Sequence, residues 1–314
     1  MESELISIVT PCFNEEGNIE DLVSQVRQVF QRMNHAHYEH IFIDNNSTDK
    51  SQEILRRLAK DDKKIKVIIN NRNFGHIRSP YYGLLQARGD AVILLVADLQ
   101  DPPSMIEAFV AKWREGSKVV LGVKTRSDES AVMFAIRKAY YALVSNVSDT
   151  KLVKNNTGFG LYDKRVLQIL KDIEDPYPYF RGLISELGFN AALIEYTQPS
   201  RKRGVTSNNF YKLYDMAMLG ITSHSKVPLR MATMAGFAFS FVSFLAALVY
   251  LVLKLSFWNQ FQLGLAPMLV GIFFMMSVQL FFIGIIGEYV GFIHTQALKR
   301  PLVTEKERIN FDSL

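Results

Sequence analysis

The stretch "AVILLVADLQDPP", residues 91–103, joins an apolar segment to a polar end. Its first seven residues are apolar, which is typical of a strand buried on both faces of a sheet. Asp98, Gln100 and Asp101 then bring three oxygen-bearing side chains together before two prolines interrupt regular structure. Asp98 and Gln100 are two residues apart, so both point to the same side if the chain stays extended. The stretch therefore predicts a buried strand that ends in a polar site.

Similar apolar runs occur at residues 5–11, 40–44, 66–70 and 118–123, and helical patterns such as 76–88 and 104–115 separate them. This alternation predicts a mostly parallel, Rossmann-like sheet with helices on both faces, an α/β fold. Ligands bind such sheets outside the carboxyl ends of the strands. Three strand ends are polar, at residues 10–16, 44–49 and 97–101. Turn residues would explain any one of them, but three at one sheet edge predict a binding site.

Composition limits the partners. The 314 residues carry a net charge of +5, which favours anionic partners. Nucleic acid is disfavoured because the sequence contains no reader motif and its basic residues gather beside the apolar segments. Cys12 is the single cysteine, which excludes an intramolecular disulfide and fits a reducing compartment. The first residues do not have the pattern of a signal peptide.

The second part of the chain is apolar. Segments 227–253 and 263–293 are each long enough to cross a hydrocarbon core, which takes roughly 20 residues. A pair of core helices is the alternative, disfavoured because neither segment has a polar face. The expected organisation is a cytoplasmic domain over 1–207, an interfacial amphipathic helix over 208–226, two transmembrane helices and a cytoplasmic tail over 294–314. Periodicity does not separate the interfacial helix from a core helix of the domain.

Basic residues flank the apolar pair on its outer sides, whereas the short connector between the two segments contains only Lys254. The positive-inside tendency then places both termini in the cytoplasm, in a multi-pass protein of the plasma (inner) membrane. Gly287 and Gly291 form a GxxxG pattern that favours close helix contacts within the chain or in a homo-oligomer. The outer basic residues are Lys202, Arg203, Lys212, Lys226, Arg230, Lys299, Arg300, Lys306 and Arg308.

The polar end of the 91–103 stretch indicates a metal site. A carboxylate at Asp98 and an amide oxygen at Gln100 suit a hard cation such as Mg²⁺ or Mn²⁺. Such an ion takes one or two protein ligands and completes its shell from substrate phosphates. The sequence contains no GxxxxGK[ST] loop, so a P-loop is excluded, and no HExxH motif or Cys/His cluster, so zinc is disfavoured.

The segments "VTPCFNEEGNI", "IDNNSTD", "NRNFGH" and "ADLQDPP", followed by two apolar spans, resemble the family 2 glycosyltransferases. They are most similar to the polyprenyl-phosphate glycosyltransferases related to dolichyl-phosphate mannose synthase and bactoprenol glucosyltransferases. The resemblance covers essentially the whole chain. It implies a GT-A fold and a metal-dependent, inverting transfer of a sugar from a UDP- or GDP-sugar to a polyprenyl phosphate. The product would be a polyprenyl-phosphate sugar for cell-surface glycan synthesis.

The resemblance also implies roles for individual residues. The metal and the diphosphate are expected at Asp98 and Gln100. A solvated surface position is the alternative for Arg126 and Arg137. The nucleotide-sugar is expected at Pro11, Phe13, Glu15, Asp44, Asn45, Asn73 and Asp98. The acceptor phosphate is expected at Lys124, Arg126, Arg137, Arg201 and Arg203, and catalysis at Asp98, Gln100, Arg126, Arg137 and Arg201.

Several positions depart from the family pattern. Val96 stands where the first aspartate of Asp-Ala-Asp is usual, and Asn45 where a second nucleotide-contacting aspartate is expected. The segment "NNTGFGLYD", residues 155–163, lacks the family's acidic residue and arginine and has Gly158 and Gly160 instead. In the segment "RKRGVTS", residues 201–207, Ser207 stands where the corresponding family motif ends in a lysine. We interpret these changes as a subfamily with a different donor.

Two other functions remain open, and the departures at Val96, Asn45 and Gly158 motivate the second of them. One is a family 2 transferase that uses another lipid-linked acceptor. The other is a non-catalytic membrane partner subunit. Metal-dependent binding of a nucleotide-sugar separates the enzymatic hypotheses from the non-enzymatic one.

Overall fold

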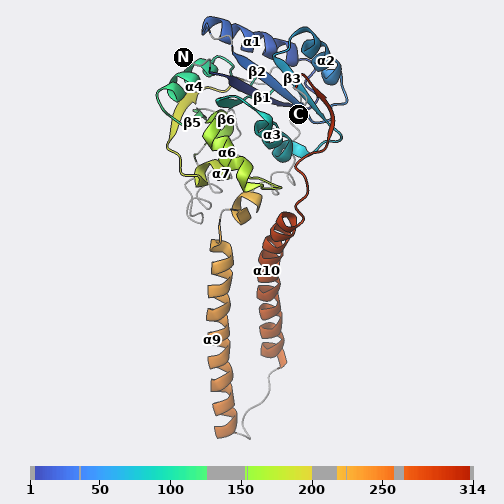
Figure 1. Cartoon of the computed structure of the whole chain (residues 1–314). Coiled ribbons are helices and arrows are strands. Elements are labelled where there is room, and N and C mark those ends of the chain that lie inside the picture. The colour runs from blue at the N-terminus through green and yellow to red at the C-terminus, as the bar shows by residue number, and fades with distance from the viewer. Residues whose placement is uncertain are drawn as a thin grey trace.

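The computed structural model describes residues 4–34, 37–125, 153, 155–199, 218–223, 225–257 and 265–311. It shows an α/β domain from which two long helices extend (Figure 1). The strands are β1 (Ile6–Cys12), β2 (Tyr38–Asp44), β3 (Ile65–Asn70), β4 (Ala91–Leu94), β5 (Val119–Lys124), β6 (Asn156–Asp163), β7 (Ala191–Tyr196) and β8 (Glu305–Ile309).

These strands form one sheet in the order β7-β5-β6-β4-β1-β2-β3-β8. Strand β1 pairs in parallel with β2 and β4, β2 with β3, and β5 with β7. Strands β6 and β8 run antiparallel to their neighbours. The predicted α/β class with a mostly parallel sheet is therefore confirmed.

Helices cover both faces of the sheet. Helices α1 (Ile19–Arg32), α2 (Ser51–Asp61) and α4 (Met105–Arg114) pack on one face. Helices α3 (Gly75–Gln86), α6 (Lys164–Ile173) and α7 (Phe180–Glu186) pack on the other face. This is the face toward the two long helices (Figure 1).

The sheet has two hydrophobic cores, one on each face. In β2, Phe42 enters the core with α1 and α2, whereas Ile41 and Ile43 enter the core with α3. Side chains of a strand alternate between its faces, so a strand covered on both sides is apolar at most positions. This is the physical reason for the continuous apolar runs in the sequence.

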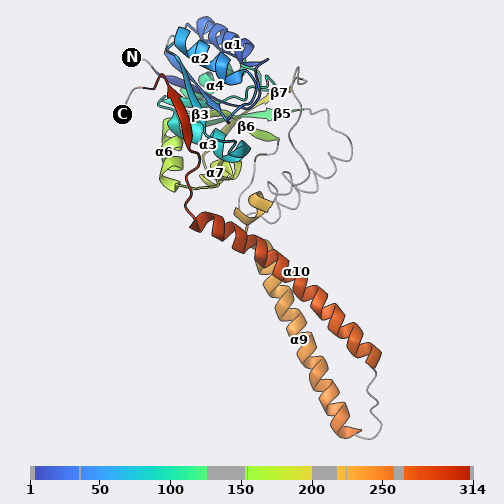
Figure 2. The ribbon, with the colours of Figure 1, turned by 90° about the vertical axis from the view of Figure 1, so that its right-hand side faces the viewer.

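Two helices in the C-terminal part are long and apolar enough to cross a membrane. Helix α9 (Val227–Ser256) and the part of α10 (Leu265–Ala297) from Met268 to Ala297 each contain an 18-residue window that is 0% buried, and the mean hydropathies of the two windows are 2.3 and 2.4. Large side chains such as Phe237 and Phe281 are 73% and 66% exposed. Core helices would bury these side chains, so that alternative is excluded for the described residues. The two helices form a hairpin below the domain (Figure 2).

The chain returns to the sheet after α10. Strand β8 pairs antiparallel with β3 and forms the edge of the sheet. Glu307 forms an ion pair with Arg56 at 2.7 Å, and Glu305 accepts a hydrogen bond from Tyr82 at 2.7 Å. The segment 294–314, expected to be a tail, thus continues α10 to Ala297 and then adds a strand to the domain.

Other expectations differ in part from the structure. The strand expected over 91–97 ends at Leu94. Residues 218–223 of the expected interfacial helix are helical and Leu219 is buried, while residues 208–217 lie outside the described part of the chain. A Cβ placed on Gly287 or Gly291 would lie more than 4 Å from any side chain and from the backbone of other described elements, so neither glycine is in close contact with α9 within the chain.

Candidate active site

The polar strand ends meet at one edge of the sheet. Because β1, β2, β3 and β4 are parallel, their carboxyl ends lie together. Antiparallel β6 brings its first residues to the same edge, beside the ends of β4 and β5. The convergence predicted from the sequence is thus present.

The loops after β1 and β2 are joined into one unit. The backbone amide of Asn14 donates to Ser47 Oγ at 2.9 Å, and that of Glu15 donates to Ser51 Oγ at 2.9 Å. The amide of Thr48 donates to Asn14 Oδ1 at 2.8 Å. These bonds bring the expected nucleotide residues of both loops to one place.

Asp44 lies beneath this unit and is fully buried. Its Oδ1 accepts from the amide of Ser47 and from Gln52 Nε2, both at 3.0 Å, and the Ser47 hydroxyl donates to Oδ2. Burial raises the pKa of Asp44, and the hydrogen bonds from Ser47 and Gln52 oppose that rise. Burial and the nearby Asp44 raise the pKa of the Cys12 thiol. By contrast, Phe13 is 41% exposed.

Asn45 holds the loop that follows β3. Its Nδ2 donates to Asn73 Oδ1 at 2.9 Å and to the carbonyl of Gly75 at 3.1 Å. Its Oδ1 accepts from the amide of Phe74 at 2.8 Å and from Asn70 Nδ2 at 3.1 Å. An aspartate has no N–H to donate to the first pair. The geometry therefore explains why asparagine stands where the family pattern has an acid.

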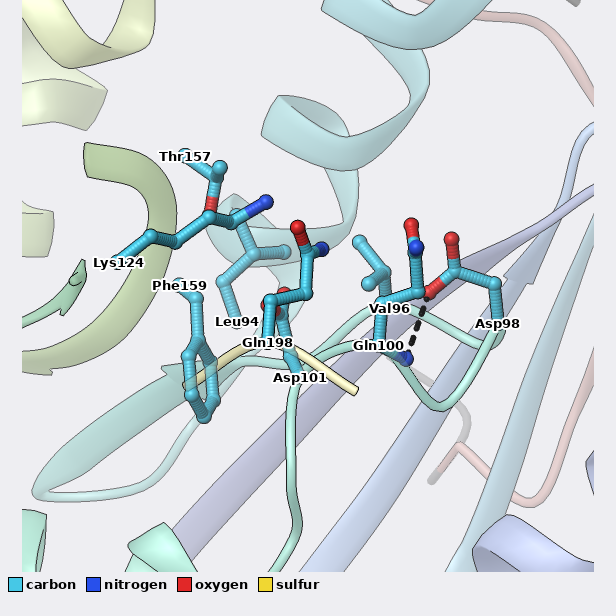
Figure 3. Close-up of a pocket in the computed structure, with 9 residues that line it drawn as sticks. All are labelled: Leu94, Val96, Asp98, Gln100, Asp101, Lys124, Thr157, Phe159 and Gln198. Carbon is cyan, nitrogen blue, oxygen red and sulfur yellow. Dashed lines mark hydrogen bonds between the residues drawn. The ribbon is translucent and has the colours of Figure 1, made fainter. Parts of the chain in front are cut away.

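A cavity of about 190 Å³ opens between the ends of β4, β5, β6 and β7 (Figure 3). Asp98, Gln100 and Lys124, three of the residues expected in the site, line it together. The other lining residues are Leu94, Val96, Asp101, Thr157, Phe159 and Gln198.

Asp98 and Gln100 reach the cavity from a turn, not from the extended strand expected from the sequence. Leu99 between them has a left-handed backbone with φ 58°, and Asp98 Oδ1 accepts from the amide of Gln100 at 3.1 Å. Both side chains point to the same side of the loop (Figure 3). The expected common direction is present, but the turn produces it.

Asp101 was not among the expected site residues, although it lies in the same motif. It is 3% exposed, and its Oδ1 accepts from the hydroxyl of Tyr196 at 2.6 Å. Burial raises the pKa of this carboxyl to about 6, against the hydrogen bond from Tyr196 and the positive charge of Lys124. The bond joins the floor of the cavity to the end of β7.

The structure explains why glycine occurs at two positions of the segment 155–163. Gly158 has a φ of 95°, which L side chains rarely adopt. A Cβ on Gly160 would lie 2.4 Å from the carbonyl oxygen of Val120 in β5. The close approach of β5 and β6 therefore leaves no room for an arginine at Gly160. Lys124 supplies positive charge to the cavity instead and extends into it in the direction of Gln198 (Figure 3).

The donor set fits a hard divalent cation that shares its shell with a substrate. Asp98 offers a half-buried carboxylate and Gln100 an amide oxygen at one cavity wall. No group of three or more His, Cys, Asp or Glu among the described residues is arranged to hold a metal by itself. An ion here would take one or two protein ligands and the remainder from diphosphate and water, as Mg²⁺ does.

The expected residues divide into three sets. Asp98, Gln100 and Lys124 share the cavity. Arg126, Arg137, Arg201 and Arg203 lie outside the described residues. Pro11 and Asp44 lie in the last residues of β1 and β2, and Phe13, Glu15, Asn45 and Asn73 lie in the loops that follow β1, β2 and β3. Sequence reasoning missed Thr157 and Gln198; the first lies in a recognised motif, while no sequence signal marks the second.

Comparison with known proteins gives consistent matches. The profile described as Glycosyl transferase family 2 matches residues 7–170. The chain is 35% identical to the uncharacterized glycosyltransferase YkcC of Bacillus subtilis, over 94% of this chain and 91% of that protein. It is 34% identical to the bactoprenol glucosyl transferase of Shigella phage SfV, over 94% of this chain and 96% of that protein. A crystal structure of glucosyl-3-phosphoglycerate synthase from Mycobacterium tuberculosis is 17% identical, with a TM-score of 0.49, over 70% of this chain and 76% of that chain.

Proposed function

Because the chain belongs to glycosyl transferase family 2, we propose that it transfers a sugar from a nucleotide-sugar to a polyprenyl phosphate at a membrane surface. Relatives named bactoprenol glucosyl transferase match along nearly the full chain, apolar helices included, and they support a lipid acceptor. The observation that carries the proposal is the cavity, in which Asp98 and Gln100 lie on one wall and Lys124 on another.

The donor half of the reaction uses the ends of β1 to β4. In this proposal Phe13, which is exposed, and the loop held by Asn45 bind the nucleotide, and the hydrogen bonds of Asn45 to that loop support this role. Asp98 and Gln100 would hold Mg²⁺ or Mn²⁺, which when bound neutralises charge on the departing diphosphate. The contribution of the protein is to hold Asp98 and Gln100 in place, at the wall where the diphosphate would bind, before the reaction begins.

The acceptor half needs a positive site for a phosphate. A lipid phosphate oxygen is already an anionic nucleophile, so its attack on the anomeric carbon needs no general base. As the new carbon–oxygen bond forms, the bond to the diphosphate breaks and the configuration inverts. Lys124 orients the attacking phosphate, which makes positioning its main contribution. Arg126, Arg137, Arg201 and Arg203 remain predicted partners of the same phosphate.

Replacing Lys124 with glutamine is expected to lower the efficiency toward the lipid phosphate about ten- to a hundredfold, the usual loss for a charge-assisted hydrogen bond. Donor affinity should not change. Steady-state kinetics with donor and acceptor varied separately measure both effects. The control is Lys112→Gln, an exposed lysine on α4. Weaker donor binding with an unchanged efficiency toward the lipid phosphate would show that Lys124 acts on the donor.

We also propose that α9 and α10 cross the membrane as a hairpin. Strand β8 supports this arrangement, because it returns the chain to the sheet of the domain after α10. The domain and the residues after α10 would then lie on the same side of the membrane, which the flanking charges assign to the cytoplasm.

Thiol labelling tests this orientation. A cysteine replacing Phe257, which is 53% exposed at the end of α9, should react with an impermeant reagent added to intact cells. One replacing Lys306 in β8 should react only after the cells are opened, and buried Cys12 should give little background. Labelling of the cysteine at position 306 but not of that at position 257 in intact cells would show the opposite orientation. Equal labelling of both from outside would contradict the hairpin.

Binding of nucleotide-sugars to purified protein tests whether the chain is an enzyme. Titration calorimetry with UDP- and GDP-sugars is expected to show binding of a donor that strengthens when Mn²⁺ is present. If no donor in the panel binds with the ion present, the non-catalytic partner subunit becomes the better account.

A further inference from the structure

A second cavity lies where the end of α10 meets the domain. Its volume is about 510 Å³, and it is lined by α3, the end of α6, the loop that follows it and the segment after α10. Among the described residues, it shares none of its lining side chains with the cavity at Asp98. It is therefore separate from the proposed site of transfer.

Hydrogen bonds hold the parts of this junction together. Gln296 Nε2 of α10 donates to Asp175 Oδ1 at 2.9 Å, and the same oxygen accepts from the amide of Tyr177 at 2.8 Å. Higher on α10, the hydroxyl of Tyr289 donates to the carbonyl of Ser225 at 2.6 Å, just before α9. The cavity is thus part of the connection that fixes α10 to the domain.

The lining combines charged and apolar side chains. Lys171, Lys299 and Arg300 contribute three positive charges, while Glu174 and Asp175 contribute two negative ones. The lining therefore has a net charge of +1, and one oxygen of Asp175 already accepts hydrogen bonds from Gln296 and from the amide of Tyr177. A guanidinium such as Arg300 suits a phosphate because its N–H groups match two phosphate oxygens.

The position of the cavity indicates where a ligand would come from. Apolar side chains on α10 stay exposed to its last turns, with Ile293 at 62% and Leu298 at 42%. Lys299 and Arg300 follow directly, and Lys299 has a φ of 43° where the chain turns away from the helix. If α10 spans the bilayer, this turn lies at the depth of the lipid headgroups.

We propose that this cavity binds the phosphate headgroup of an anionic phospholipid, a ligand distinct from the polyprenyl phosphate that accepts the sugar. The phosphate contacts Lys299 and Arg300, and the glycerol and upper acyl carbons pack on Leu85, Ile173 and Leu302. The apolar lining residues favour a lipid over a free phosphate ion, which has no apolar group to pack against them. The inference rests on the membrane placement proposed above and does not depend on the transfer reaction.

The test is native mass spectrometry of the full chain in detergent, with phosphatidylglycerol and phosphatidylcholine added in equal amounts. The wild-type protein should retain phosphatidylglycerol preferentially. The double variant Lys299→Gln, Arg300→Gln should retain it about five- to thirtyfold less, from the usual contribution of a basic residue near an anionic surface. The matched control is Lys226→Gln, Arg230→Gln, which removes the same charges at the start of α9, outside the cavity.

Each other outcome overturns the inference in a distinct way. Equal losses in both double variants would show general charge attraction without a cavity site. Unchanged retention in the cavity variant would place the lipid elsewhere. Displacement of the lipid by millimolar inorganic phosphate would assign the cavity to a free anion. The assay needs no turnover, so an inactive protein that retains the lipid would contradict only the proposed function.

Discussion

Replacing Asp98 with asparagine is expected to reduce sugar transfer about a hundred- to a thousandfold, the usual effect of removing one preorganised electrostatic group from an active site. The substitution keeps the shape of the side chain but removes the carboxylate charge that a divalent cation requires. Asp98 is half-buried in a turn, so the fold should remain intact.

Initial rates with both substrates saturating, together with the melting temperature, separate chemistry from folding. The matched control is Asp61→Asn, an exposed carboxylate at the end of α2, which should retain wild-type activity. Full activity of the Asp98 variant, or of the wild-type protein in excess EDTA, would remove the metal from the mechanism.

Replacing Asn45 with aspartate is expected to destabilise the protein by about 2–5 kcal/mol, because two donated hydrogen bonds become contacts between acceptors. The affected partners are Asn73 Oδ1 and the carbonyl of Gly75. The new carboxylate would also lie next to buried Asp44 in the sequence. The loop after β3 should loosen, so donor affinity should fall together with stability.

Thermal unfolding and donor titration measure these two effects. The control is Asn34→Asp, an exposed residue at the end of α1, where both quantities should stay near their wild-type values. A stable Asn45→Asp variant that binds donor more tightly would show that position 45 contacts the nucleotide directly. The substitution restores the family's acidic residue. A structural role of Asn45 predicts weaker donor binding in this variant, whereas direct contact with the nucleotide predicts tighter binding.

Much of the architecture follows from sequence patterns because burial imposes them. Strands β1 to β5 coincide with apolar runs, since each is covered by helices on both faces. The convergence of polar strand ends follows from parallel pairing. Both long helices could be predicted from length and hydropathy alone.

Other features depend on contacts between distant residues. Strand β8 has the sequence "EKERI", which is polar and short, as edge strands commonly are. Its partner β3 lies more than 200 residues earlier, and pairs such as Arg56 with Glu307 have no local signal. The same holds for the bond between Tyr196 and Asp101, which places a buried carboxyl in the cavity.

Local backbone geometry also makes the site differ from the one predicted from the sequence. Leu99 adopts a left-handed conformation that its sequence does not favour, and the resulting turn directs Asp98 and Gln100 into the cavity. The close packing of β5 against Gly160 explains a departure from the family pattern as steric exclusion. Neither effect could be read from residue types alone.

Formation of a bond between the sugar and a lipid phosphate can be measured directly as product. Detergent-purified protein is incubated with radiolabelled UDP- and GDP-sugars, undecaprenyl phosphate and Mn²⁺, and the label in the organic phase is counted. We expect that one donor labels the lipid, and that the label is absent without the lipid phosphate, in EDTA and in the Asp98→Asn variant. Label that never enters undecaprenyl phosphate but enters another lipid of a membrane extract would contradict the proposed acceptor, and no labelled product from any donor would contradict the proposed activity.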